Sequence, residues 1–279
     1  MDHVLWLGGG CGSGKSSIAR ELTHRLDLRL YAVDAHGYDH HRRLGGQDLG
    51  GHDERWLLPT PEQLADRFVR ESEERLTLIF DDLTAMREGP LVLAEGAQLF
   101  PELVAAHLAS PGHGLWLVPT DEFQRRALGQ RAAPQATSDA ERAGRNRLAR
   151  DSMLNALIRR QASDIGLTVI EVDGSRTLLE MMEAVQSHFA EHIAAGPRAR
   201  DGAERRRIRR EENESVHSNL ASYQADVGMA QAPIFDFACE CVTLGCRERV
   251  RLSIDEYGTT LAQPDRFVVV PDHLTEMDP

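Results

Sequence analysis

The sequence near the amino terminus reads Gly9-Gly10-Cys11-Gly12-Ser13-Gly14-Lys15-Ser16, which has the spacing G-x-x-x-x-G-K-S of a phosphate-binding loop, or P-loop. Glycines at these positions let the backbone turn so that successive N–H groups point at phosphate oxygens. In such a loop the lysine reaches the β- and γ-phosphates, and the serine hydroxyl binds Mg²⁺. A helix that begins at the end of the loop adds the positive end of its dipole. The residues expected to bind nucleotide are Gly9, Gly12, Ser13, Gly14, Lys15, Ser16 and Ser17.

Lys15 is the only lysine among the 279 residues, and all of the other basic side chains are arginine. A P-loop needs a compact ammonium group on a flexible stem, and a planar guanidinium group is a poor substitute for it. The single lysine therefore lies where the motif requires one, which favours a working nucleotide site over a chance match. We expect Lys15 to be catalytic.

The composition is that of a globular protein, with 41% hydrophobic and 27% charged residues. A net charge of −12 argues against general nucleic-acid binding. No apolar run approaches the length of a membrane span, and the residues before the glycine-rich loop do not resemble a signal peptide. Four cysteines do not suggest a disulfide framework, so we expect a cytoplasmic location.

Short apolar runs separated by helical patterns are predicted to be buried strands. They cover Val4–Leu7, Leu28–Val33, Leu91–Ala94, Leu115–Val118 and Leu167–Val172. This alternation predicts an α/β fold of the P-loop NTPase type, with a five-stranded parallel doubly wound sheet and helices on both faces. Ligands of such sheets bind beyond the carboxyl ends of the strands. The residues at those ends are the P-loop, Asp34, Glu95, Thr120 and Asp173.

The segments between these strands give further expectations. The polar stretch 35–53 is rich in glycine and histidine, and we expect it to be a functional or mobile loop. A long helix is predicted from Pro61 to Met86, because Thr60 can cap it and Pro61 suits its first turn. A shorter helix is predicted from Gln98 to Leu108.

The composition changes after residue 195, which predicts three parts of the chain. Residues 1–195 form the P-loop domain, and residues 196–233 form a charged linker or exposed helix. Residues 234–279 form a small α+β module that contains three of the four cysteines. Strand-like runs in this module cover Phe235–Cys239, Val250–Ile254 and Arg266–Val270.

Glu95 closes the apolar run Leu91–Ala94, which is the pattern of an acidic residue that holds Mg²⁺ directly or through water. Many P-loop proteins have aspartate at this position. A glutamate could instead contact the substrate or orient a water molecule. Ser16 and Glu95 are the candidate Mg²⁺ ligands.

Taken together, these features resemble the P-loop small-molecule kinases, a family that includes nucleoside and nucleotide kinases and chloramphenicol phosphotransferases. The resemblance covers residues 1–195. It implies that Asp34 faces the acceptor and takes its hydroxyl proton, although a cap of the following turn is the alternative. It also implies a mobile lid whose Arg125 and Arg131 neutralise charge on the transferred phosphoryl group. Asp173 and Gly174 lie where the family holds the adenine base.

The carboxy-terminal module contains Cys239, Cys241, Cys246 and His273, which could form a tetrahedral Cys₃His zinc site. Alternate residues of a strand point to the same side, so Cys239 and Cys241 could share one ion. A module of this size also gains stability from a structural metal. The C-x-C spacing is tighter than usual, and buried free cysteines are the alternative.

The sequence thus predicts an ATP- and Mg²⁺-dependent phosphotransferase that acts on a small-molecule acceptor, such as a nucleoside, a nucleotide or a natural-product hydroxyl. One alternative is a nucleotide-dependent regulatory ATPase whose carboxy-terminal module binds a partner. A second alternative is a nucleic-acid-end kinase or RNA-binding protein, which only the arginine run 205–210 favours. Neither a membrane nor nucleic acid is an expected partner.

Overall fold

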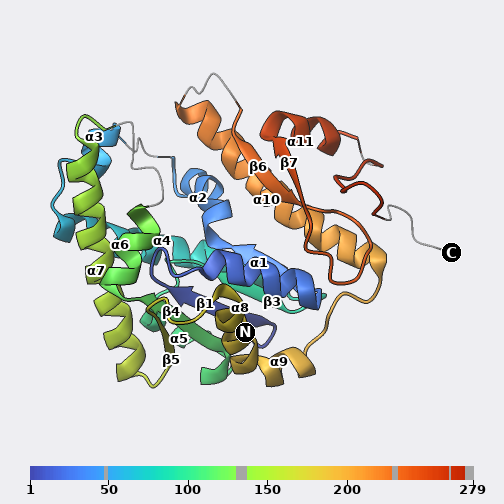
Figure 1. Ribbon diagram of the computed structural model, residues 1–279, viewed down its shortest axis with the longest axis horizontal. Helices are drawn as coiled ribbons and strands as arrows, with labels where there is room; N and C mark the ends of the chain where they lie inside the picture. The colour runs from blue at the N-terminus through green and yellow to red at the C-terminus, as the bar shows by residue number, and fades with distance from the viewer. Residues whose placement is uncertain (47–49, 130–136, 228–231, 264, 274–279) are drawn as a thin grey trace.

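The computed structural model describes residues 1–279 except 47–49, 130–136, 228–231, 264 and 274–279. Its central sheet has five parallel strands in the order β2-β3-β1-β4-β5 (Figure 1). The strands are β1 (Val4–Gly9), β2 (Arg29–Ala32), β3 (Val92–Glu95), β4 (Gly114–Pro119) and β5 (Thr168–Val172). All five strands predicted from the apolar runs are present, and the predicted α/β fold of the P-loop NTPase type is confirmed.

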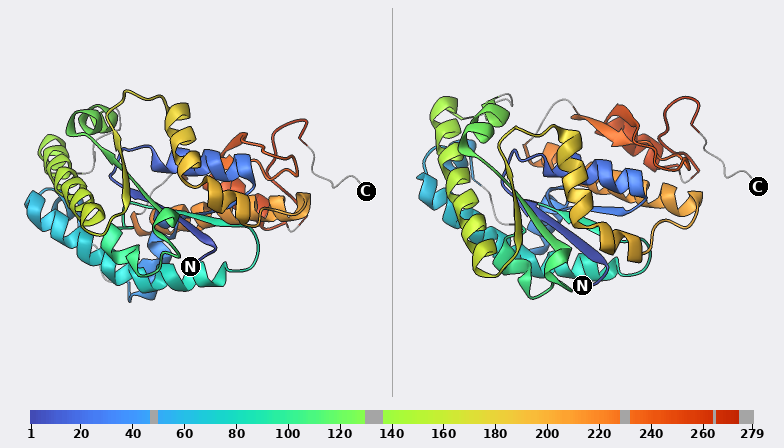
Figure 2. Two further views of the ribbon diagram at one scale, coloured as in Figure 1. Left: turned by 90° about the horizontal axis from the view of Figure 1, so that it is seen from below. Right: turned by 60° about the horizontal axis from the view of Figure 1, so that its bottom comes forward.

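Helices cover both faces of the sheet, because alternate strand residues supply two separate cores. On one face Trp6 and Trp116 pack among apolar residues of three helices, α4 (Pro61–Ala85), α5 (Pro101–Ala105) and α7 (Ala140–Asp164). On the other face Leu5 and Leu7 pack against α1 (Lys15–Leu26), α8 (Leu178–His188) and α9 (Ala190–Ala195). Figure 2 shows the sheet between these two helical layers.

Local signals set the helix boundaries. The backbone of Gly14 has a φ of 86°, and α1 begins at the next residue. The predicted helix from Pro61 is confirmed as α4, and the hydroxyl of Thr60 accepts a hydrogen bond from the N–H of Gln63. The helix predicted over 98–108 is shorter than expected, since α5 begins at Pro101 and ends at Ala105. Two further short elements of this domain are α6 (Asp121–Gly129) and the 3₁₀ turn η2 (Pro111–His113).

The expectation of a loop over residues 35–53 is wrong for most of that stretch. Strand β2 ends at Ala32, and a 3₁₀ turn, η1 (Val33–His36), leads into the helix α2 (Gly37–Arg43). A further short helix, α3 (His52–Trp56), begins at the end of the stretch. Polar composition was misleading here because one of the histidines is fully buried and hydrogen-bonded.

That buried histidine is His40, which belongs to a polar network that attaches α2 to α4. The Nδ1 atom of His40 accepts a hydrogen bond from Arg75 at 3.2 Å, so its Nε2–H donates to Asp82 at 2.8 Å. The hydroxyl of Tyr31 also donates to Asp82, at 2.8 Å. Burial by itself would raise the pKa of Asp82, but hydrogen bonds from His40, Arg43 and Tyr31 outweigh it and hold the pKa well below its ordinary value.

The predicted charged linker contains the long helix α10 (Gly202–Val227), which is less exposed than the charges suggest. It lies along the β2 edge of the sheet and contacts η1 and α2 (Figure 1). Arg209 and Glu212 are buried on this helix at 2% and 7% exposure. The expectation of a solvated segment is therefore wrong, because these charges are paired within the fold.

Arginines of the run 205–210 also have partners within the protein. Arg205 donates to Asp27 at 2.9 Å, and Arg207 forms an ion pair with Glu211. The guanidinium group of Arg206 lies 4.2 Å from the centre of the Phe267 ring. The arginine run is thus an internal anchor of α10.

The carboxy-terminal module has two antiparallel strands, β6 (Ile234–Ala238) and β7 (Arg249–Ser253), followed by α11 (Ile254–Leu261). Phe237 and Tyr257 stack in its core with ring centres 4.3 Å apart. The third predicted strand, Arg266–Val270, is not a strand in the structure. Its backbone instead bonds to Glu240, whose N–H donates to the carbonyl of Val268 at 2.7 Å.

In the described part of the chain, no helix combines the length and hydrophobicity that a membrane span requires.

The network around Asp82 makes a prediction about stability. Asp82→Asn should lower the free energy of unfolding at pH 7 by about 1–3 kcal/mol, because buried donors lose a charged acceptor. A depressed pKa stabilises the fold above the unfolded value of 3.8, and this contribution is lost as the pH falls through the folded value. The difference between variant and wild type should therefore shrink towards about pH 2.

Denaturant unfolding followed by circular dichroism measures this difference, and Asp81→Asn is the matched control. Asp81 is the neighbouring exposed residue of α4. Equal unfolding free energies for the two variants at pH 7 would contradict the role of the network.

Candidate active site

The P-loop connects the end of β1 to the start of α1 at the carboxyl edge of the sheet. Gly9, Gly12 and Gly14 have φ values of 127°, 81° and 86°, a region that residues with a side chain rarely adopt. A Cβ atom on Gly9 would lie 2.0 Å from the carbonyl oxygen of Leu117. The loop therefore needs glycine both for its turns and for its close contact with β4.

Lys15 is buried at 7% exposure, and its ammonium group donates to the carbonyl oxygen of Gly10 at 2.9 Å. A buried ammonium group is costly unless acceptors or negative charges compensate it. The Gly10 carbonyl and the nearby carboxylate of Glu95 supply that compensation. The side chain is thus held inside the loop, where the motif places the phosphates.

Two polar side chains that were not predicted from the sequence hold the backbone of the P-loop by hydrogen bonds. Gln124 of α6 donates to the carbonyl oxygen of Cys11 at 2.8 Å, and Asn155 of α7 donates to Gln124 at 3.1 Å. Both are buried at 1% exposure. No sequence signal marks them, because they are isolated polar residues within helical patterns.

Ser16 and Glu95, the candidate Mg²⁺ ligands, lie together at the start of α1 and the end of β3. Glu95 lies opposite Leu7 of β1 and Ala32 of β2 in the sheet and is only 3% exposed. Burial raises the pKa of Glu95, whereas the charge of Lys15 and a hydrogen bond from Ser16 lower it. A serine hydroxyl beside a buried carboxylate is a donor set that suits Mg²⁺.

Asp34 is exposed in η1, directly after β2, and reaches the same edge of the sheet as Glu95. Its Oδ1 atom accepts a hydrogen bond from Gln98 at 2.9 Å, so a side chain that follows β3 orients it. Gly96 allows this approach, since a Cβ atom there would lie 2.8 Å from Cβ of Val33. The end of β3 and the turn that carries Asp34 therefore fit together only when residue 96 is glycine.

A cavity of about 820 Å³ opens beside Asp34. Residues of η1, α2, α3, α4, α7 and α10 form its wall. Among the described residues its charged lining consists of Asp34, Arg55, Arg67, Glu71, Glu74, Arg75 and Arg150. The rings of Tyr38, Trp56 and Phe68 line it as well. The cavity combines flat apolar surfaces with guanidinium groups and is large enough for a small molecule.

Arg150 is a buried arginine of this wall. It is 5% exposed, and its Nε donates to Asp151 at 2.8 Å. Its guanidinium group also lies 5.3 Å from the ring centre of Trp56 and 5.4 Å from that of Phe68. Buried charge, a carboxylate partner and two rings therefore hold one guanidinium group at the cavity.

The structure describes one of the two arginines that were predicted to belong to a lid. Arg125 is exposed on α6, donates to the carbonyl oxygen of Asp121 at 3.2 Å and does not line the cavity. Arg131 lies outside the described residues. Their role over the phosphates stays a prediction.

Asp173 and Gly174 follow β5 and lie beside α6. The carbonyl oxygen of Asp173 accepts a hydrogen bond from Arg126 at 3.2 Å. A Cβ atom on Gly174 would lie 2.9 Å from the ring of Phe123. The predicted adenine-binding segment is therefore close to the helix that supports the P-loop, and its role stays a prediction.

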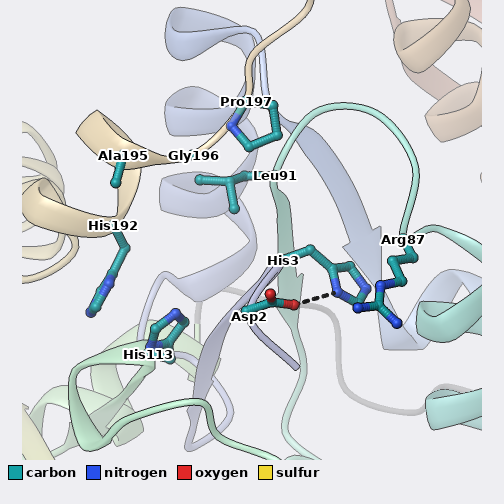
Figure 3. A pocket seen from close by; sticks show the side chains of 9 residues that line it. All are labelled: Asp2, His3, Arg87, Leu91, His113, His192, Ala195, Gly196 and Pro197. Atoms are coloured by element: carbon teal, nitrogen blue, oxygen red, sulfur yellow. Dashed lines mark ion pairs between the residues drawn. The ribbon is translucent and has the colours of Figure 1, made fainter.

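A second cavity, of about 340 Å³, lies at the opposite edge of the sheet (Figure 3). Asp2 and His3 precede β1 there, Leu91 precedes β3, and His113 precedes β4. The ring of His192 faces that of His113 with centres 3.8 Å apart. Because this cavity is at the amino ends of the strands, it contains none of the residues predicted for the site.

The cysteines of the carboxy-terminal module also come together. One ligand atom from each of Cys239, Cys241, Cys246 and His273 lies within 4.8 Å of the others. The sequence predicted this grouping, and the structure places it in the module, apart from the P-loop.

Comparison with solved structures finds many that are similar to part of this chain, and two of them are described here. One is a shikimate kinase from Acinetobacter baumannii in complex with shikimate, with a TM-score of 0.39 and 15% sequence identity over 67% of this chain and 93% of that chain. The other is TT1252 from Thermus thermophilus, with a TM-score of 0.40 and 23% identity over 67% of this chain and 96% of that chain. No family model matches the sequence, and no curated protein sequence matches it.

The surroundings of Gly96 and of Gly144 predict opposite effects on stability when each glycine is replaced by alanine. Gly96→Ala should lower the free energy of unfolding by about 1–3 kcal/mol, because its methyl group overlaps Val33. Gly144→Ala, in α7 with nothing within 4 Å of the new atom, should raise it by about 0.5–1 kcal/mol. Thermal and denaturant unfolding measure both changes, and a stabilised Gly96→Ala variant would contradict the described contact.

Proposed function

We propose that the protein is an ATP-dependent phosphotransferase that transfers the γ-phosphoryl group to a hydroxyl group of a small molecule. The observation that carries this proposal is the position of Asp34. Its carboxylate lines the 820 Å³ cavity and reaches the sheet edge that bears Lys15, Ser16 and Glu95. A carboxylate between a phosphate site and an acceptor cavity is what phosphoryl transfer to a hydroxyl group requires.

In the proposed reaction the acceptor oxygen forms a bond to the γ-phosphorus while the bond from that phosphorus to the β,γ-bridging oxygen breaks. The acceptor proton passes to the carboxylate of Asp34, which Gln98 holds in place. Lys15 and the amides of the P-loop bind the phosphates. Ser16 and Glu95 would hold Mg²⁺, which neutralises charge on the β- and γ-phosphates when it is bound.

The lining of the cavity favours an acceptor that carries a negative charge and a flat or apolar ring. Arg150 is buried and Arg75 is half-buried, so water screens their charges less than those of exposed arginines. Trp56 and Phe68 offer aromatic faces on the same wall. The size of the cavity suits a small molecule better than a polymer.

Around the phosphates, we propose that Arg125 and Arg131 close over the transferred group as a lid. Asp173 and Gly174, with Arg126 beside them, would contact the adenine base. The four cysteines are free, which fits a reducing cytoplasm where ATP is abundant.

A regulatory ATPase is the second candidate, because the carboxy-terminal module contacts the P-loop helix. Arg247 of the module forms an ion pair with Glu21 of α1. A regulator would hydrolyse ATP slowly without any acceptor and would bind a protein partner only with nucleotide. A transferase releases ADP in proportion to a phosphorylated small molecule, so product analysis by mass spectrometry separates the two.

Lys15→Ala tests the nucleotide site. The variant should lose at least about 100-fold in phosphotransfer rate, because a preorganised cation is removed from the transferred phosphoryl group. Isothermal titration calorimetry with a non-hydrolysable ATP analogue and Mg²⁺ should show weaker binding as well. Arg20→Ala on the same helix is the control and should keep nucleotide binding. Unchanged affinity and rate for Lys15→Ala would contradict the proposal.

Asp34→Asn separates chemistry from nucleotide binding. The variant should bind the ATP analogue as tightly as wild type but lose about 100- to 10,000-fold in rate, because the acceptor proton has no base. ADP release is measured against a panel of small hydroxylated compounds. Asp39→Asn is the matched control, since Asp39 follows closely on α2 but does not line the cavity. Equal rates for both variants would remove Asp34 from the mechanism.

A further inference from the structure

We propose that Cys239, Cys241, Cys246 and His273 bind one structural zinc ion, and that this ion fastens the carboxy-terminal module to helix α10. The four residues come from three separate segments of the module. Cys239 and Cys241 follow β6, Cys246 follows a turn at Gly245, and His273 lies at the end of the described chain. This site is independent of the proposed phosphotransferase activity.

The distances between the ligand atoms fit a tetrahedral zinc site. Both Sγ of Cys239 and Sγ of Cys246 lie 3.4 Å from Nδ1 of His273. Zinc bonds of about 2.3 Å to sulfur and about 2.0 Å to nitrogen give tetrahedral edges of ~3.5 Å between S and N. All four ligand atoms lie within 4.8 Å of one another. Three sulfurs and one imidazole nitrogen complete the coordination that structural zinc prefers.

The backbone brings the last ligand into place. Asp272 has a φ of 67°, in the left-handed region that turns the chain sharply, and the N–H of His273 donates to the carbonyl of Val270 at 3.2 Å. The turn directs the ring of His273 back towards the cysteines. Val269 and Val270 pack against the same cluster.

Hydrogen-bond donors surround the sulfur atoms as they would surround thiolates. The N–H of Val270 donates to Sγ of Cys239 at 3.4 Å, and the guanidinium group of Arg209 donates to Sγ of Cys241 at 3.4 Å. Three thiolates exceed the charge of one Zn²⁺ by one negative charge, and the buried Arg209 offsets it. Neutral thiols are weak acceptors, so these donors point to a metal-bound state.

Arg209 also links the cysteine segment to other parts of the protein by hydrogen bonds. Besides Cys241, it donates to the carbonyl of Thr243 at 3.0 Å and to Asp27 at 3.4 Å. Asp27 caps the carboxyl end of α1. A single guanidinium group thus connects the cysteine segment, helix α10 and the helix that begins in the P-loop.

The two segments that carry the four ligands have no regular secondary structure of their own. Residues 239–248 and 266–273 form neither strand nor helix. Its apolar core around Phe237 and Tyr257 is a separate cluster from the one that the three cysteines form. An ion that joins both irregular segments would compensate for this small core.

Elemental analysis of the full-length protein, purified without chelators, tests the metal itself. We expect about one zinc per chain in wild type, and a ratio below about 0.2 would overturn the proposal. Cys241→Ser should lose most of the zinc, whereas Cys11→Ser, which alters the cysteine of the P-loop, should keep it. Equal zinc content in these two variants, or iron in place of zinc, would also overturn it.

Two measurements on wild type do not depend on whether a variant folds. Reconstitution with Co²⁺ after chelation should give the intense visible bands of tetrahedral cobalt with sulfur-to-cobalt charge transfer, and a weak octahedral spectrum would contradict the site. Hydrogen–deuterium exchange should rise on zinc removal in residues 234–273 and in α10, but not in β1 or β4. Unchanged exchange in α10 would overturn the fastening role.

Discussion

The buried ammonium group of Lys15 is the charge on which the arrangement of this site depends. A lysine that is 7% exposed must be compensated, and its partners are the carbonyl of Gly10 and the buried carboxylate of Glu95. Both partners lie at the carboxyl edge of one parallel sheet, where the ends of β1 and β3 meet. In the proposed function, this edge would bind the phosphates of the nucleotide.

The groups on the two sides of the Lys15 ammonium group differ in charge. On one side the P-loop is supported by neutral side chains, Gln124 and Asn155, which hold the backbone without adding charge. On the other side Asp34 lines a cavity in which rings and a carboxylate hold Arg150. In the proposed function, the nucleotide and the acceptor would therefore meet at this edge of the sheet.

Helix α10 connects this edge of the sheet to the carboxy-terminal module. Its Asn219 accepts a hydrogen bond from the N–H of Tyr38 at 3.0 Å and lines the cavity. Glu212 of the same helix contacts His24 of α1 at 2.6 Å. Burial alone would raise the pKa of Glu212, but His24, Arg249 and Arg20 lower this pKa to about 2. The helix is therefore held by charged partners from α1 and from the module.

The sequence was sufficient to predict the five strands of the central sheet, the P-loop and the convergence of Asp34 and Glu95, because short apolar runs and glycine spacing are local signals. The grouping of three cysteines and His273 was also predictable from residue types. Burial of His40 and Arg209 was not, because a polar residue reveals its partner only in three dimensions. For the same reason, the sequence could not show which of its many arginines line the cavity, Arg150 among them.

A crystal structure with a non-hydrolysable ATP analogue and Mn²⁺ in place of Mg²⁺ tests the central claim most directly. We predict a γ-phosphate that contacts Lys15 and faces Asp34 across the mouth of the cavity, with the anomalous signal of manganese beside Ser16 and Glu95. A nucleotide whose γ-phosphate points away from the cavity, or a metal bound elsewhere, would contradict phosphoryl transfer at this site.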